Sequence, residues 1–142
     1  MQDEQDIERI VRYFKERDEV VSLYLFGSSA RARTTKESDI DIAVLIDGSG
    51  VKKTDLERFR KEYFTASPRF SLRSVDIVIL NTAPPFLKYQ VLKKGRVLFE
   101  RERTLRVRFT EKAINEYLDY KPIQDIYLKA VARRFRERTL DR

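Results

Sequence analysis

The 142-residue sequence contains no cysteine, no histidine and no tryptophan. The absence of cysteine excludes a disulfide framework and cysteine-ligated metal sites, and the absence of histidine removes imidazole as a metal ligand or general base. No run of about 20 apolar residues is long enough to span a bilayer, and the acidic N-terminus lacks the apolar region of a signal peptide. We therefore expect a cytoplasmic protein with no membrane association, whose chemistry uses carboxylates, hydroxyls, lysine or arginine.

The net charge of +7 is concentrated near the C-terminus. Residues 101–142 carry 12 lysines and arginines against 7 acidic residues, a local excess of +5. A solvated helix face with interspersed acids accounts for this pattern, while docking of an acidic protein or of nucleic acid remains an alternative. We do not favour nucleic acid as the partner.

Hydrophobic periodicity predicts helices and strands in alternation. We expect helices over residues 3–17, 54–64 and 84–95, and strands over 20–26, 38–46, 74–80 and 97–99. From residue 104 onward a helical pattern is interrupted by Pro122, which indicates two helices or one kinked helix. This order predicts an α/β (α+β) fold with helices packed on a small mixed sheet. Residues 1–100 would form the core, and residues 101–142 a helical extension that packs on the core or on a partner.

Two acids interrupt an otherwise apolar strand. Asp39 and Asp41 lie two residues apart, so both side chains project from one face of the strand, about 6 to 7 Å apart. Two such carboxylates raise each other's pKa unless a cation lies between them. Asp76, in the strand 74–80, is a candidate third acid. All-oxygen ligands favour a pair of Mg²⁺ ions, or Mn²⁺, as in phosphoryl-transfer sites.

A candidate phosphate-binding turn precedes these acids. Gly27 and Ser28 follow the strand 20–26, where a glycine lets a phosphate approach the backbone and exposed N–H groups can face an anion. Ser29 and Arg31 are further candidate phosphate contacts. The simpler interpretations are a turn residue for Gly27, a helix cap for Ser28 and a solvated loop charge for Arg31. The P-loop pattern is absent. The combination indicates a site for a metal-chelated nucleoside triphosphate.

The spacing of these residues resembles a known signature. Gly27-Ser28, ten residues and then Asp39-Ile40-Asp41 are similar to the G-S-x10-D-x-D motif of polymerase-β-like nucleotidyltransferases. The short length and the tail GRVLFERERTLRVRFTEKAINEYLDY resemble the minimal subgroup called MNT, and within it the MntA-type antitoxins paired with HEPN ribonuclease toxins. The resemblance covers nearly the whole chain. Many relatives read G-S-R-A-R-G, whereas this chain has Ser29 and Ala32 in place of the first arginine and the last glycine.

The resemblance implies a role for each candidate residue. Asp39 and Asp41 would bind the metal ions, and Asp76 would be the third acid and general base. Gly27 and Ser28 would contact the β- and γ-phosphates of ATP. The implied reaction is in-line transfer of AMP from ATP to a hydroxyl, with pyrophosphate leaving. The implied acceptor is a tyrosine of a cognate HEPN toxin, which this AMPylation would silence, and the pair would form a hetero-oligomer.

Other functions remain open from the sequence. The acceptor hydroxyl could belong to a small molecule such as an aminoglycoside, although about 40 residues after the core leave little room for a substrate domain. A non-catalytic antitoxin that neutralises by binding, and RNA-directed nucleotide addition, are further alternatives. The charge pattern does not distinguish ATP from other nucleotides.

Overall fold

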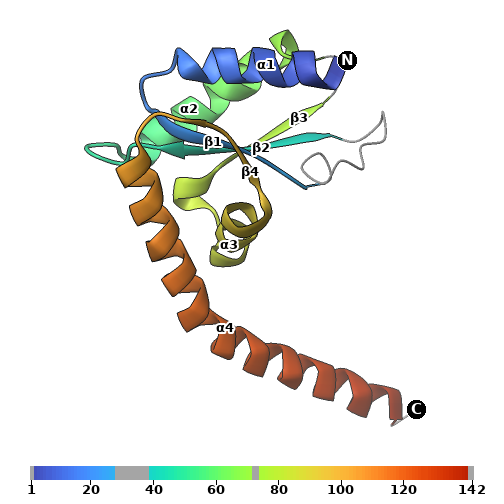
Figure 1. The fold of residues 1–142 in the computed structure, drawn as a ribbon. Helices are drawn as coiled ribbons and strands as arrows, with labels where there is room; N and C mark the ends of the chain where they lie inside the picture. The colour runs from blue at the N-terminus through green and yellow to red at the C-terminus, as the bar shows by residue number, and fades with distance from the viewer. Residues whose placement is uncertain (1, 28–38, 72–73, 141–142) are drawn as a thin grey trace.

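The computed structural model describes residues 2–27, 39–71 and 74–140, in which helices and strands alternate (Figure 1). The elements are α1 (Gln2–Lys15), β1 (Val20–Phe26), β2 (Ile40–Ile46), α2 (Lys53–Ala66), β3 (Val75–Ile79), α3 (Pro85–Lys94), β4 (Arg96–Glu100) and α4 (Arg103–Leu140). Each predicted helix and strand is present, with ends that differ by at most two residues where the sequence predicted a boundary. The predicted α/β fold class is confirmed.

The four strands form one mixed sheet in the order β3-β2-β1-β4. β1 pairs antiparallel with both β2 and β4, while β2 and β3 run parallel. The parallel pair is joined through α2, since parallel neighbours need a crossover connection. β3 and β4 are therefore the two edges of the sheet.

Each face of the sheet is covered by helices. The isoleucines at even positions of β2, including Ile40 and Ile42, belong to a core with residues of α1 and α2. Ala43 and Leu45 belong to a second core that includes Val91 of α3. Figure 1 shows α1 and α2 on one side of the sheet and α3 on the other. Because strand residues alternate between faces, Asp41 projects toward the face that carries α3.

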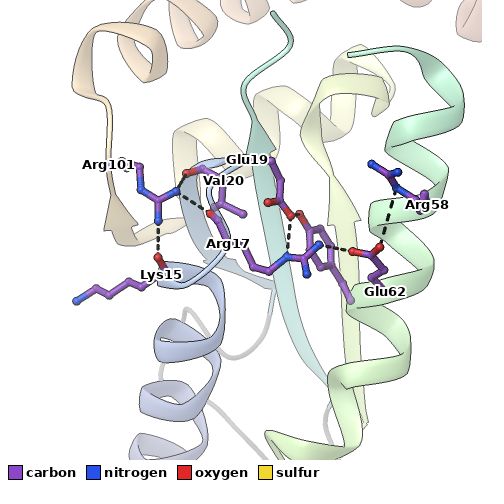
Figure 2. A network of polar contacts seen from close by, with 8 residues as sticks. Lys15, Arg17, Glu19, Val20, Arg58, Glu62 and Arg101 are labelled. Atoms are coloured by element: carbon purple, nitrogen blue, oxygen red, sulfur yellow. Dashed lines mark hydrogen bonds and ion pairs between the residues drawn. The ribbon is translucent and has the colours of Figure 1, made fainter. Parts of the chain in front are cut away.

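A polar network joins the end of α1 to β1, α2 and β4 (Figure 2). The Arg17 guanidinium pairs with Glu19 at 2.8 Å and also with Glu62 of α2, and the Tyr63 hydroxyl donates to Glu19 at 2.8 Å. Arg101, just after β4, donates to the carbonyl oxygens of Arg17 at 2.6 Å and Val20 at 3.1 Å. These contacts fix the helices against the sheet at the end opposite to Asp41.

The C-terminal residues form a single helix, α4, with Pro122 inside it. Its first part packs on α3, where Tyr117 stacks on Tyr89 with ring centroids 4.1 Å apart and Lys88 pairs with Glu116 at 3.6 Å. Figure 1 shows that the helix then changes direction and extends away from the sheet. Among the described residues, none of the helices has the length and apolar character needed to cross a membrane.

Candidate active site

Two of the predicted acids lie side by side in the sheet. Asp41 of β2 is the register partner of Asp76 of β3. Partners on neighbouring strands are about 4.8 Å apart and project from the same face. The sequence placed these acids on different strands, and the parallel register brings them together.

The position of Asp41 makes its negative charge costly. The residue is partly buried, between the fully buried Ile42 and the nearly fully buried Ile40. Burial raises the pKa of the Asp41 carboxyl above its ordinary value, and the neighbouring charges of Asp76 and Asp39 raise this pKa further. A cation bound between these carboxylates would oppose the repulsion from Asp76 and Asp39 and favour the ionised form of Asp41.

Asp39 lies just before β2 and is exposed, as is Asp76. Its charge is close enough to raise the pKa of Asp41. In the part of the chain that the structure describes, no group of three acidic side chains is already arranged to hold a metal ion. The structure therefore pairs Asp41 with Asp76, and the role of Asp39 as a ligand stays a prediction.

Gly27 lies against the carboxylate of Asp41. It follows β1 directly, where Phe26 is the register partner of Asp41, and its φ of 72° is in the left-handed region that glycine adopts readily. A Cβ atom at this position would overlap Oδ2 of Asp41 and would lie 3.1 Å from its Cγ. A side chain at position 27 would therefore collide with the Asp41 carboxylate, and the approach of a phosphate to Gly27 stays a prediction.

The other predicted phosphate contacts are Ser28, Ser29 and Arg31. All three lie outside the described residues. Their roles stay predictions.

A cavity beside the acids is lined by residues that the sequence analysis did not identify. Arg60, Lys61 and Phe64 of α2 line it together with Asp39 and Asp76. One signal was available in the sequence: Leu56, Phe59 and Tyr63 define the apolar face of α2, and Phe64 lies outside that face. An aromatic residue on the polar side of an amphipathic helix indicates a surface contact.

Comparison with protein families identifies the chain. The profile of the family described as "Polymerase beta, Nucleotidyltransferase" matches residues 8–104, which include β1, β2 and β3 and all three acids. The chain belongs to the polymerase beta nucleotidyltransferase family. The predicted enzyme class, nucleotidyltransferase, is confirmed by this membership. No curated protein matches the chain.

Similar solved structures include antitoxins in complex with toxins. A toxin–antitoxin crystal structure with AMP-PNP has a chain 24% identical, with a TM-score of 0.69 over 89% of this nucleotidyltransferase and 98% of that chain. An MNT antitoxin in complex with a tri-AMPylated HEPN toxin of Shewanella oneidensis is 24% identical, with a TM-score of 0.65 and coverages of 93% and 99%. The MntA–HepT toxin–antitoxin structure is 23% identical, with a TM-score of 0.63 and coverages of 89% and 97%. The resemblance to the MNT subgroup is therefore confirmed at the level of the fold.

The residues of the site fit a hard divalent cation. Carboxylate oxygens are the donors present, and Mg²⁺ in nucleotide sites is usually held by one or two carboxylates plus substrate phosphates. Asp41 and Asp76 supply such a pair. Burial raises the pKa of Asp41 and the charges of Asp76 and Asp39 raise it further, and a bound cation would oppose this second cause.

Proposed function

We propose that this chain transfers AMP from ATP to a tyrosine hydroxyl of a HEPN toxin and thereby acts as its antitoxin. The single observation that carries the proposal is the register of Asp41 with Asp76, beside a glycine whose missing Cβ leaves room for the Asp41 carboxylate. Family membership supports nucleotidyl transfer. The similarity to an MNT antitoxin bound to an AMPylated toxin supports the choice of acceptor.

In this proposal Asp41 and Asp76, with Asp39, would hold two Mg²⁺ ions, for which Mn²⁺ could substitute. The ions would supply charge neutralisation on the triphosphate and a lower pKa for the attacking hydroxyl. Gly27 leaves the Asp41 carboxylate in place beside the turn that we assign to the β- and γ-phosphates. The described side chains thus position charge, which is the main protein contribution in phosphoryl-type transfer.

The proposed transfer exchanges one bond at the α-phosphorus of ATP for another. The acceptor oxygen forms a bond to the α-phosphorus of ATP, and the bond from that phosphorus to the bridging oxygen of the β-phosphate breaks. Pyrophosphate leaves with the bonding electrons. The hydroxyl proton passes to the carboxylate of Asp76, which we assign as general base.

We assign the second half of α4 to the docking of the HEPN partner. An apolar stripe runs along this half at spacings of three or four residues, and its members are Tyr120, Ile123, Tyr127, Val131 and Phe135. Ile123 is 65% exposed and Tyr127 66% exposed. Large apolar side chains at such exposure on one helix face indicate a protein interface. This surface gives the extension of residues 101–142 a role on a partner, while Tyr117 packs on the core.

Intact mass spectrometry tests the transfer. The chain is incubated with ATP, Mg²⁺ and a candidate HEPN partner, and the HEPN protein gains the mass of one or more AMP groups. Asp41→Asn abolishes the gain. Asp47→Asn, the same change at the other end of β2 in an exposed turn, retains it. An unmodified HEPN protein after incubation with the wild-type chain would refute the proposed reaction.

Neutralisation by binding alone is the second candidate, because the exposed apolar stripe of α4 can support a complex without catalysis. The two candidates are separated by toxicity in cells that express the HEPN protein. If Asp41→Asn still neutralises the toxin, binding is sufficient. If Asp41→Asn does not neutralise the toxin, catalysis is required. If Ile123→Asp also loses neutralisation while Lys129→Asp, on the opposite face of α4, retains it, docking through α4 is required as well.

A further inference from the structure

The outer side of β3 is an open sheet edge. β3 is the last strand in the sheet order, and no strand among the described residues pairs with its outer side. The Ile40 N–H donates to the Ser74 carbonyl oxygen at 2.9 Å, so Ser74 directs its backbone groups toward β2. Because successive residues of a strand alternate in direction, Val75 and Ile77 direct their N–H and C=O groups outward. No backbone group of the described residues bonds to them on that side, so an added strand would pair with them.

A groove runs along this edge, between β3 and α2. Two cavities of about 700 and 650 Å³ line up there and share Glu57, Arg60, Asp76 and Ile77, so they form one continuous groove. Asp76 therefore lies inside the groove, and Asp39 lines one of its cavities. A ligand in this groove would contact the carboxylates of the active site directly.

The α2 wall of the groove is basic and carries an exposed aromatic ring. It contributes Lys53, Arg60 and Lys61 against a single acid, Glu57. Within the described residues, neither Arg60 nor Lys61 forms an ion pair. Phe64 is 73% exposed at the same wall. This chemistry complements an acidic segment that also has an apolar or aromatic side chain.

We propose that this groove binds the acceptor protein as an extended segment, which adds a strand to β3 with its acceptor hydroxyl beside Asp76. The proposal rests on the proposed transfer to a protein hydroxyl and identifies how that acceptor is recognised. Strand addition at an open edge supplies affinity through main-chain hydrogen bonds, and side-chain pockets supply specificity.

Sheet geometry sets the specificity. The residue that lies opposite Asp76 in the added strand projects from the same face as Asp76 and Asp41. Its two neighbours in the segment project toward the α2 face, where they meet Arg60, Lys61 and Phe64. We therefore assign the acceptor tyrosine to the position beside Asp76 and an acidic residue to the position before or after it.

Charge reversal on the groove wall tests this assignment. In Arg60→Glu/Lys61→Glu, the Kd of the HEPN protein measured by calorimetry without ATP rises by about tenfold or more, because two charge-assisted contacts become repulsive. The KM for the HEPN protein in the transfer assay rises with it, while the KM for ATP stays near the wild-type value. The matched control is Arg12→Glu/Lys15→Glu, the same charge change in the groove beside β4, the opposite edge. The control leaves the Kd and both KM values within about twofold of wild type.

Hydrogen exchange tests the added strand. Binding of the HEPN protein slows exchange at the amides of Val75 and Ile77, which are directed outward, and leaves the amides of β4 unchanged. Unchanged exchange at both β3 amides, an unchanged Kd in the Arg60/Lys61 variant, or a rise in its KM for ATP would each overturn the proposal. If the wild-type chain binds the HEPN protein and transfers no AMP, the proposed reaction is refuted. The Kd and hydrogen-exchange data then still show whether the HEPN protein binds in the groove between β3 and α2.

Discussion

Alanine substitution at Gly27 tests whether this residue is required by the Asp41 carboxylate. Gly27 and Gly50 share a φ of 72°, but a Cβ at Gly27 would overlap Asp41 whereas a Cβ at Gly50 has no atom within 4 Å. Gly50 is therefore a matched control for the backbone conformation. The difference between the two alanine variants isolates the contact with the carboxylate.

The expected magnitudes follow from two contributions. Alanine in the left-handed region costs about 1–2 kcal/mol, of which about 0.4–1 kcal/mol is regained because alanine restricts the unfolded chain. Gly50→Ala should therefore lower the free energy of unfolding by about 1 kcal/mol. Gly27→Ala must also move the Asp41 side chain away from its rotamer, at a further cost of about 0.5–1.5 kcal/mol. We expect a total near 2 kcal/mol for Gly27→Ala.

Catalysis should separate the two variants more sharply than stability does. Displacement of a positioned group by about 1 Å can lower a rate by about a hundredfold, so Gly27→Ala should lose most AMP transfer and Gly50→Ala should retain it. Urea unfolding and the mass-based transfer assay measure the two effects. In the background Asp41→Ala, the additional stability cost of Gly27→Ala should disappear. Equal stability and equal activity of the two glycine variants would refute the reasoning.

Three further changes have defined outcomes. Burial and the adjacent acids raise the pKa of Asp41 above 3.8, so the folded state holds the proton more tightly than the unfolded chain and ionisation of Asp41 destabilises the fold as pH rises. Asp41→Asn should therefore raise the Tm of the metal-free protein at pH 7, and the difference from wild type should vanish below about pH 4. An equal difference in Tm at both pH values would contradict this. Asn81 accepts from the Ile46 N–H at 2.9 Å and donates to the Ile46 carbonyl at 2.8 Å, so Asn81→Ala should cost about 1–3 kcal/mol in urea unfolding, and a change below 0.5 kcal/mol would argue against this bridge. Arg101→Met removes donors to the Arg17 and Val20 carbonyls and should cost about 1–2 kcal/mol with transfer activity intact; a loss of activity at full stability would contradict its structural role.

The elements of the fold were predictable because each has a local cause. A run of β-branched and aromatic residues that ends at Gly27 marked β1, and an apolar run interrupted by Asp39 and Asp41 marked β2. Pro85 and Gly95 marked the two ends of α3. The start of α2 differs from the prediction: the helix was expected over residues 54–64, but α2 begins at Lys53, and Asp55 accepts a hydrogen bond from the Lys52 N–H at 2.9 Å. The acid at the third position of the helix satisfies that donor, so the helix begins one residue earlier.

The candidate acids could be named from the sequence, whereas the register that places two of them side by side could not. The spacing of Asp39 and Asp41 required only the geometry of one strand. The pairing of Asp41 with Asp76 depends on the alignment of β2 with β3. The apolar pattern fixes which face each acid occupies, but a shift by two residues would keep that face and separate the two acids. The groove depends on α2 lying beside β3, so Arg60 and Phe64 had no local signal of their position near the acids.

The distal part of α4 illustrates a limit of a different kind. Helical periodicity predicted the apolar positions of α4, but it left open whether these positions pack on the core or on a partner. Ala113 and Tyr117 are buried, whereas Ile123 and Tyr127 are exposed. Periodicity reports which residues share a face, and only the direction of the helix decides what that face meets.

Binding of Mg²⁺ in the presence of a non-hydrolysable ATP analogue tests most directly the claim that Asp41 and Asp76 act as one site. Calorimetry on the wild-type chain and on Asp47→Asn should give the same Mg²⁺ affinity. Asp41→Asn and Asp76→Asn should each abolish the Mg²⁺ binding, while urea unfolding shows both variants to be folded. If Asp76→Asn binds Mg²⁺ with wild-type affinity, the two carboxylates do not share a metal, and the account of the active site is contradicted.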